Sequence, residues 1–287
     1  HGIGATILIL NKLRKSLTGY TNPRGFKTSD INRAITYDTT VVASWRTYLS
    51  AYTNNKNPFA NKHILELGPG ADLGIGLLLL ASTARSYQAL DKHPLASSAP
   101  RAIYDRLIDS LHHLSVAEKT YLTTEIEHTL NGKPHHLTYH VDPSFTTATL
   151  KPPIDLIVSQ AAFEHFDNPH EVIQSLNRVV HPGTILCAEI DLMTHTRYLR
   201  ENDPLNIYRY SDSFYQATSF AGTPNRWRSA DYIQTLIACG WGKIRCIPLQ
   251  KASSEYLAKT KSHLARQFNT KTDDWSVLTC MILATKN

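Results

Sequence analysis

The stretch Glu66-Leu67-Gly68-Pro69-Gly70-Ala71-Asp72-Leu73-Gly74 lies between two apolar segments. Residues 63–67 before it predict a short buried strand, and residues 73–84 predict a helix. Glycine at positions 68 and 70 lets the backbone approach a bound molecule closely, and the first N–H groups of a helix attract a carboxylate or a phosphate. The stretch therefore predicts a strand-turn-helix unit with a ligand site at its turn.

Outward from this turn, strand and helix patterns alternate along the chain. Further strands are expected at 86–90, 137–141, 154–159, 184–190, 241–249 and 275–284, and helices at 99–114, 116–130, 169–180 and 229–239. A longer amphipathic helix is expected before the turn, with Ser29 as its N-cap and apolar residues at helical spacing up to Leu49. His181-Pro182-Gly183 is expected to end the helix at 169–180. The alternation predicts an α/β protein whose parallel sheet is covered on both faces and binds ligands beyond the carboxyl ends of its strands.

The same pattern divides the chain into four parts. An N-terminal helical segment covers residues 1–61, and the core of the fold covers 62–190. Residues 191–228 are rich in Tyr, Arg, Asp and Pro without strong periodicity, which indicates a cap inserted after the fifth strand. Residues 229–287 return to the core.

The composition excludes several classes of protein. Of the 287 residues, 42% are hydrophobic and 19% are charged, which rules out a disordered, collagen-like or coiled-coil chain. The net charge of +6 is too small to predict a nucleic-acid partner. The four separated cysteines lack the spacing of zinc ligands or redox pairs, so we expect reduced thiols in a cytoplasmic protein.

No apolar run is long enough to span a bilayer. The longest, residues 5–10 and 77–81, fall far short of the ~20 residues required. Residues 3–17 combine an apolar run with Lys12, Arg14 and Lys15, so this helix either makes weak contact with a membrane surface or, as we expect, packs on the protein. The chain starts at His1 rather than Met, which favours a tag remnant or a trimmed start.

Two acidic residues follow the next two strands. Asp91 ends the strand at 86–90, 23 residues after Gly68, where a carboxylate can accept hydrogen bonds from both hydroxyls of a ribose. Asp142 ends the following strand and either accepts from an adenine amine or caps a turn. A dinucleotide fingerprint requires G-x-G-x-x-G, but the third glycine here, Gly74, falls one position late. Together the three strand ends favour a ligand that contains a nucleoside.

Over residues 64–191 the chain resembles the class I S-adenosylmethionine-dependent methyltransferases of type 11 or 12. The resemblance rests on the turn Glu66 to Gly70, on Asp91, on the block Ile154 to Phe166, and on the segment Leu176 to Gly183. It implies a Rossmann-like, seven-stranded and mostly parallel sheet with an antiparallel last strand, N-terminal helices, and the cap after the fifth strand. Within the family, the overall pattern is similar to methyltransferases found among polysaccharide and lipopolysaccharide genes.

The resemblance implies S-adenosylmethionine as the cofactor. Gly68 and Gly70 would approach its methionine part, and Asp91, Asp142 and Gln160 would bind its ribose, adenine and amino group. The full expected set of cofactor residues is Glu66, Gly68, Pro69, Gly70, Asp91, Lys92, Asp142, Pro143, Gln160 and Tyr37. Tyr37 lies in the long N-terminal helix and either closes over the cofactor or, like Trp45, belongs to the core.

Four side chains beyond the fourth and fifth strands are the candidates for catalysis: His165, Glu164, Asp191 and His195. His165, with an ordinary pKa of about 6.5, suits a general base for a hydroxyl acceptor, and its alternative is a structural role. Asp191 and His195 would orient the acceptor. A metal role for them, together with Glu189, is disfavoured because no tight acidic cluster accompanies them.

Two histidine pairs, His112-His113 and His135-His136, invite a second metal hypothesis. Adjacent residues of a helix or strand point apart, so we expect no shared site at either pair. No bound metal is therefore predicted.

The cap supplies the candidate substrate residues: Arg197, Tyr198, Tyr208, Arg209 and Arg226. Arginine forks bind carboxylates or phosphates and aromatic faces suit sugar rings, whereas the alternative is a solvated cap with its own aromatic core. We therefore expect an enzyme that methylates an oxygen of a polar small molecule, a sugar or a glycan. The alternatives are a catalytically inactive S-adenosylmethionine-binding scaffold and, less favoured, a nicotinamide or nucleotide-sugar oxidoreductase.

Overall fold

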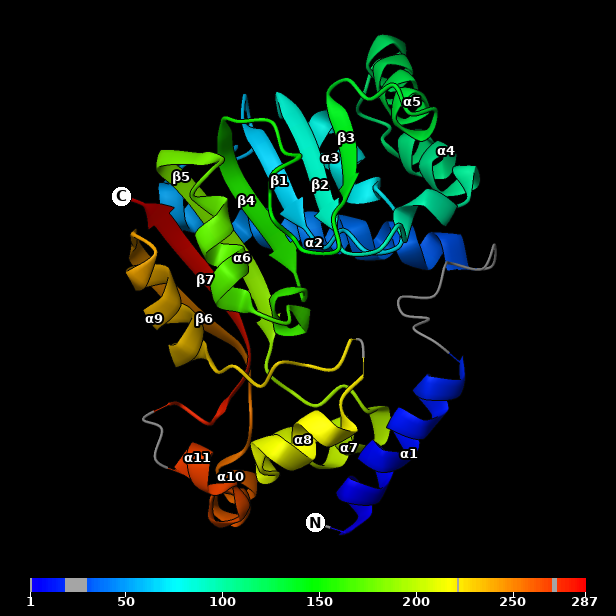
Figure 1. Ribbon diagram of the computed structural model, residues 1–287. Helices are drawn as coiled ribbons and strands as arrows, with labels where there is room; N and C mark the ends of the chain where they lie inside the picture. The colour runs from blue at the N-terminus through cyan, green and yellow to red at the C-terminus, as the bar shows by residue number, and fades with distance from the viewer. Residues whose placement is uncertain (1, 19–29, 221, 270–272) are drawn as a thin grey trace.

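The computed structural model describes residues 2–18, 30–220, 222–269 and 273–287. In this part of the chain, seven strands form one sheet in the order β3-β2-β1-β4-β5-β7-β6 (Figure 1). They are β1 (His63–Leu67), β2 (Ser86–Asp91), β3 (Leu137–Val141), β4 (Ile154–Gln160), β5 (Val180–Asp191), β6 (Trp241–Lys251) and β7 (Val277–Lys286). Strands β1 to β5 pair in parallel, and β7 is antiparallel to both of its neighbours. The expected mostly parallel sheet with an antiparallel last strand is confirmed.

Two hydrophobic cores cover the two faces of the sheet, because successive strand side chains point to opposite sides. Ile64 belongs to the core under α2 (Ile31–Thr53), α3 (Gly74–Ala81), α4 (Arg101–Ser110) and α5 (Val116–Leu130). Leu65 belongs to the core under α6 (Pro169–Leu176) and α9 (Ser229–Ala238). Burial on both faces explains why apolar residues predominate on both sides of the central strands instead of alternating with polar ones.

The long helix α2 is amphipathic, as its sequence predicts. Its buried residues recur at helical spacing from Ile31 to Leu49, and Trp45 is fully buried in the core. The expected N-cap, Ser29, lies outside the described residues. The helix ends at Thr53, and the following residue, Asn54, has a φ of 54°, the left-handed conformation common after a helix.

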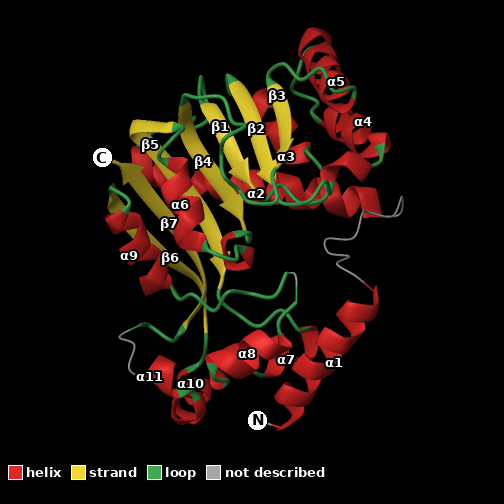
Figure 2. Ribbon diagram, in the orientation of Figure 1, coloured by secondary structure: helices red, strands yellow, loops and turns green. Residues whose placement is uncertain are grey.

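A layer of helices lies beyond the carboxyl ends of β1 to β5 (Figures 1 and 2). It contains α1 (Gly2–Thr18), α7 (Arg197–Asn202), α8 (Asp212–Thr218), α10 (Ser254–Thr260) and α11 (Arg266–Asn269). Tyr208 and Phe268 belong to one hydrophobic cluster of this layer, so residues 192–228 and the segment between β6 and β7 share a core. We call the described residues of 2–18, 192–228 and 252–276 the cap.

Helix α1 packs on residues 192–228 of the cap, whereas α2 packs on the sheet. Asn11 donates a hydrogen bond to Thr196 Oγ1, and Lys12 donates to the carbonyl oxygen of Ala217. The outer side of α1 exposes Leu10 and Leu17. None of the described helices is long and apolar enough to cross a membrane.

The segment His181-Pro182-Gly183 differs from its prediction. Helix α6 ends at Leu176, and the three residues lie within β5. Val180 pairs with Ile154, but the next pair joins Ile185 to Leu156, so the residues between them bulge out of the ladder. Gly183 has a φ of 92°, which a glycine adopts without strain. The prediction that this segment ends the helix was wrong, because it bends the following strand instead.

Candidate functional site

The glycine turn after β1 meets the loop after β4. Gly68 and Gly70 have φ values of 72° and 79°. A Cβ built on Gly68 would lie 2.5 Å from the Cβ of Ala162, whereas one on Gly70 has no described atom within 4 Å. Gly68 therefore allows the two loops to touch, and Gly70 leaves open space where a ligand can reach the backbone.

Asp91 faces the glycine turn from the end of β2. Its side chain is 7% exposed, and Oδ2 accepts a hydrogen bond from the Gly70 N–H at 3.3 Å while Oδ1 accepts from His93 at 3.1 Å. Burial raises the pKa of this carboxyl. Each carboxylate oxygen offers two acceptor positions, so the two backbone bonds leave room for hydroxyl donors.

The other residues expected near the adenine lie farther toward the surface. Asp142 accepts hydrogen bonds from the backbone N–H groups of Ser144 and Thr146 and from the Thr146 hydroxyl. The hydrogen bond from this hydroxyl is the main reason that the pKa of Asp142 is lowered. Pro143 is exposed. Lys92 pairs with the exposed Asp167. The geometry favours the turn-capping alternative for the Asp142 carboxylate.

Glu66 and Tyr37 line the inner side of the turn. Glu66 is 1% exposed and accepts a hydrogen bond from Tyr87 Oη at 2.5 Å; burial raises its pKa to about 8. Tyr37 is 51% exposed. Partial burial raises the pKa of Tyr37, and the neighbouring carboxyl groups of Glu66 and Asp38 raise it further. About half of Tyr37 is exposed, unlike the fully buried core residue Trp45.

Two carboxyl groups meet beside the start of α3. Asp38 is 3% exposed and Asp72 is 6% exposed. Both face Gly74, where a built Cβ would lie 2.1 Å from Asp38 Oδ2 and 3.0 Å from Asp72 Oδ1, which accepts the Gly74 N–H at 2.8 Å. Burial, and next the charge of Asp72, raise the pKa of Asp38 to about 10. Asp38 therefore holds a proton at neutral pH.

We expect Asp38→Asn to stabilise the protein, and more so as the pH rises. The folded state raises the pKa of Asp38 from 3.8 to about 10, so this carboxyl group loses its proton in the unfolded state first as the pH rises. The free energy of unfolding that depends on this group is therefore fully present below the unfolded pKa and falls as the pH rises toward the folded pKa. An amide cannot ionise, and its N–H group can donate a hydrogen bond to the neighbouring carboxyl group of Asp72. The gain in the free energy of unfolding should be on the order of 1–3 kcal/mol at about pH 8 and smaller at about pH 5, measured by urea unfolding.

The matched control for this variant is Asp109→Asn, which changes an exposed acid of α4. It should produce no pH-dependent gain. Equal gains at both pH values for Asp38→Asn would show that the buried proton is not on Asp38.

The end of β4 turns sharply into the site. Gln160 is its last residue, and Gln160 Oε1 is buried without a hydrogen-bond partner among the described residues. Ala161 follows with a φ of 50°, and its N–H donates to the carbonyl oxygen of Glu189 at 3.0 Å. Because Gln160 Oε1 is buried and lacks a partner, it is available to accept a hydrogen bond from a bound ligand.

The four expected catalytic side chains lie together beside this turn. Glu164 belongs to the 3-10 turn η3 (Phe163–His165), is 2% exposed, and has no hydrogen-bond partner on either carboxylate oxygen within the described part of the chain. The rings of His165 and His195 are 4.7 Å apart between centroids. His195 Nε2 lies 3.6 Å from Asp191 Oδ2 and 3.9 Å from Glu164 Oε1.

Burial sets the protonation of this group. It raises the pKa of Glu164 and lowers the pKa of His165. Burial, and then the neighbouring His165, lower the pKa of His195 to about 4. Asp191 differs from the other three because it pairs with Arg200 and accepts the N–H of Met193.

Asn225, which the sequence did not single out, fastens η3 to the cap. Its Nδ2 donates to the carbonyl oxygens of Phe163 at 2.8 Å and Phe166 at 3.1 Å, and its backbone N–H donates to the carbonyl oxygen of Glu164 at 2.7 Å. Tyr232 and Trp227 donate to its Oδ1. Asn225 therefore positions Glu164 and His165.

The candidate substrate residues of the cap have different surroundings. Tyr208 is fully buried, and its hydroxyl donates to the carbonyl oxygen of Leu192 at 2.9 Å. Arg226 is 7% exposed, and its guanidinium donates to two backbone carbonyls and pairs with Asp212. Arg209 pairs with Asp203 at 2.8 Å. For these three residues the geometry favours the alternative of an aromatic core inside the cap.

Tyr198 remains free to meet an acceptor, because its side chain is 63% exposed on α7. The side chain of Arg197 lies outside the described part of the structure.

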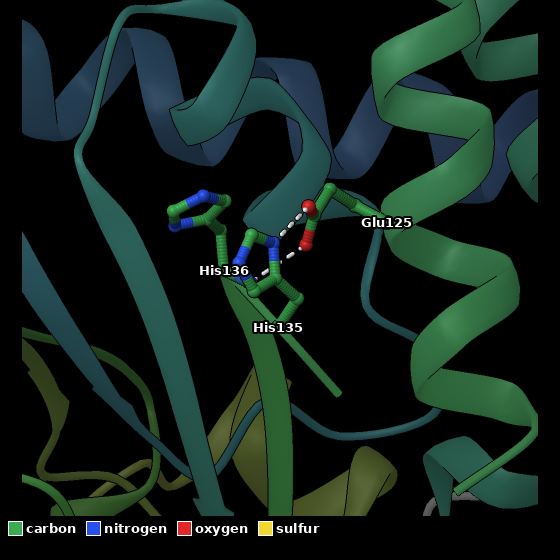
Figure 3. Close-up of side chains that lie close together, drawn as sticks. All are labelled: Glu125, His135 and His136. Atoms are coloured by element: carbon green, nitrogen blue, oxygen red, sulfur yellow. Dashed lines mark hydrogen bonds and ion pairs between the residues drawn. The ribbon is translucent and has the colours of Figure 1, made fainter. Parts of the chain in front are cut away.

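A second cluster joins α5 to the start of β3 (Figure 3). Glu125 is 2% exposed, accepts from the backbone N–H groups of His136 and Leu137, and lies 3.1 Å from His135 Nδ1. The rings of His135 and His136 are 3.9 Å apart between centroids, so the prediction that this pair points apart was wrong. Both residues precede β3, where the alternation of a regular strand does not apply.

A hollow of about 580 Å³ lies elsewhere, lined by Tyr52, Thr53, Gly183, Ile185, Lys243, Ile244, Arg245 and Thr285. It adjoins the start of β5, whereas Asp191 ends that strand. It is therefore at the opposite edge of the sheet from the site described above.

One family model matches part of this chain. Residues 109–188 match the family model described as a methyltransferase domain; the match begins after the glycine turn and ends within β5. No curated protein sequence matches this chain significantly.

Many solved structures are similar to this chain at low sequence identity. The plantazolicin methyltransferase BpumL in complex with SAH is 14% identical, with a TM-score of 0.48 over 99% of this chain and 98% of that chain. An S-adenosylmethionine-dependent methyltransferase from Mesorhizobium loti is 11% identical, with a TM-score of 0.44 over 79% of this chain and 92% of that chain.

Proposed function

We propose that this chain is a class I S-adenosylmethionine-dependent methyltransferase that methylates an oxygen of a polar small molecule, with a sugar or glycan as the favoured acceptor. One observation carries the proposal. The glycine turn after β1, Asp91 at the end of β2 and the unpartnered Gln160 Oε1 at the end of β4 meet at one edge of the sheet. A parallel sheet binds its ligands at this edge.

The residues at this edge fit the cofactor. The open space beside Gly70 admits a ligand to the backbone, Asp91 has acceptor positions left for the ribose hydroxyls, and the buried Gln160 Oε1 lacks a donor that an amino group supplies.

The cofactor would supply an electrophilic methyl group on a sulfonium, whose carbon an acceptor oxygen can attack in line, with S-adenosylhomocysteine as the leaving group. The chain has to hold the acceptor within near-attack distance and accept its hydroxyl proton. His165 Nδ1 is buried and has no hydrogen-bond partner among the described residues, so it is the proposed base. Asn225 holds the turn that carries His165, and the exposed ring of Tyr198 offers an apolar face to a sugar.

The test of this function is a methyl-transfer assay with methyl-labelled S-adenosylmethionine and a panel of acceptors, beginning with sugars and glycans. One labelled O-methyl product supports the proposal. Cofactor binding without a product on any acceptor indicates the inactive scaffold, and turnover that changes the absorbance of a nicotinamide cofactor indicates the oxidoreductase.

We expect Asp91→Ala to weaken the binding of S-adenosylhomocysteine by ~1–3 kcal/mol, because the ribose hydroxyls lose a charged acceptor. Calorimetric titration measures the change. Asp105→Ala, which removes a half-exposed acid of α4, is the control and should bind as the wild type does. Unchanged affinity in Asp91→Ala would show that the ribose lies elsewhere.

A further inference from the structure

Among the described residues, Glu164 is the one with two buried side-chain oxygens that lack a hydrogen-bond partner. It is 2% exposed, and neither of its carboxylate oxygens accepts a hydrogen bond from a described residue. Burying a carboxyl without any partner is costly, so native proteins pair such groups, hydrogen-bond them or use them to coordinate a metal.

Two imidazoles face this carboxyl group. Glu164, His165 and His195 each offer one ligand atom, and these atoms all lie within 4.8 Å of one another. His165 Nδ1 is also buried without a hydrogen-bond partner in the described ranges. Three separate donor atoms therefore converge, and two of the three residues leave them unpaired.

We propose that Glu164, His165 and His195 bind a divalent transition-metal ion beside the methyl-acceptor site. Two imidazoles and one carboxylate suit zinc or another first-row transition metal, whereas magnesium and calcium prefer oxygen ligands. Two ligands that each lie ~2.1 Å from a tetrahedral ion are about 3.4 Å apart. The 3.9 Å between His195 Nε2 and Glu164 Oε1 approaches this value, and the partly exposed His195 ring has room to move toward it.

The cluster of Glu125, His135 and His136 differs from this site because its carboxylate is already hydrogen-bonded. Both oxygens of Glu125 already accept hydrogen bonds, from two backbone N–H groups and from the His135 ring (Figure 3). Glu125 thus joins α5 to the start of β3 without an ion. This cluster supplies a matched control, because it has the same residue types in a hydrogen-bonded arrangement.

The position of the site gives the ion a role that rests on the proposed function. An ion held by three protein ligands keeps a position open for the acceptor oxygen and lowers the pKa of its hydroxyl, so that the proton passes to water. His165 then acts as a ligand instead of the base. Asp191, fixed by Arg200, adds a negative charge 3.6 Å from His195 Nε2.

The test is titration of the full chain with Co²⁺ alone, followed by visible absorption, with the variants Glu164→Gln, His195→Ala and His135→Ala. We expect the wild type and His135→Ala to bind one ion with the strong absorption of a low-coordinate site. Both Glu164→Gln and His195→Ala should bind it at least ~10-fold more weakly. Zn²⁺ should displace Co²⁺, and Mg²⁺ should not.

Three results would overturn the site: no absorption change in the wild type, unchanged binding in His195→Ala, or loss in His135→Ala alone. His195 is partly exposed, so its variant should fold, and circular dichroism verifies this. Parallel titration with S-adenosylhomocysteine separates the two proposals. Cofactor binding without Co²⁺ binding refutes only the metal site, and the reverse result refutes only the proposed function.

Discussion

Arg228→Ala is expected to destabilise the fold by ~3–5 kcal/mol, because it leaves a buried charge without its partner. Arg228 is fully buried, and its Nε donates to Asp273 Oδ2 at 2.6 Å. Its Nη2 donates to the carbonyl oxygens of Asp274 and Val277, at the start of β7. The guanidinium also stacks on the Trp275 ring, at 4.7 Å from the centroid. The residue thus joins the cap to the last strand of the sheet.

Urea unfolding measures the loss, and two further variants give it meaning. Arg101→Ala removes an arginine that pairs with Asp105 and Glu127 on the surface, and its cost should stay below about 1 kcal/mol. The double variant Arg228→Met with Asp273→Asn removes both buried charges and should be more stable than Arg228→Ala. A cost of Arg228→Ala equal to that of Arg101→Ala would contradict the buried ion pair.

His165→Ala should lower kcat for methyl transfer by ~10²-fold or more while S-adenosylhomocysteine binds with nearly unchanged affinity. Its ring is in contact with His195, beside the buried Glu164, whereas the proposed cofactor residues are Asp91 and the glycine turn. The loss is expected whether His165 accepts the proton of the acceptor or holds an ion. The Co²⁺ titration distinguishes the two roles.

The comparison variant is His170→Ala, an exposed histidine near the start of α6. It should leave both kcat and cofactor affinity at the wild-type values. Full activity in His165→Ala would assign this residue to structure. A large loss of cofactor affinity would place the cofactor, rather than the acceptor, against its ring.

The meeting of the glycine turn with Asp91 was predictable because its signals are local. Strands β1 and β2 are short and mostly buried, and Gly68, Gly70 and Asp91 stand at or just after the ends of these strands. The carboxyl ends of parallel strands meet at one edge, so the spacing along the chain alone brought these residues together. Asp142 shows the limit of this reasoning, because an acidic residue at the end of a strand can also cap a turn. Here the Asp142 carboxylate accepts three hydrogen bonds within the turn that follows β3.

The cap was less predictable because its contacts are distant in sequence. Helices α10 and α11 have seven and four residues, too few for a helical period to stand out. Asn225 donates to carbonyls 59 and 62 residues away, and a single asparagine gives no pattern that predicts this. Tyr208 and Arg226 are the types of side chain that bind sugars and anions, but the same types also form buried cores, and burial is not visible in composition.

The most direct test of the central claim is calorimetric titration of the wild-type protein with S-adenosylhomocysteine, with NADH as the control. We predict saturable binding of S-adenosylhomocysteine at one site and no binding of NADH, because the edge beyond β1 and β2 has the glycine turn and the carboxylate of Asp91 but lacks the third glycine of a dinucleotide fingerprint. Binding of NADH alone, or of neither compound, would contradict the assignment of this edge to the methyl-donor cofactor.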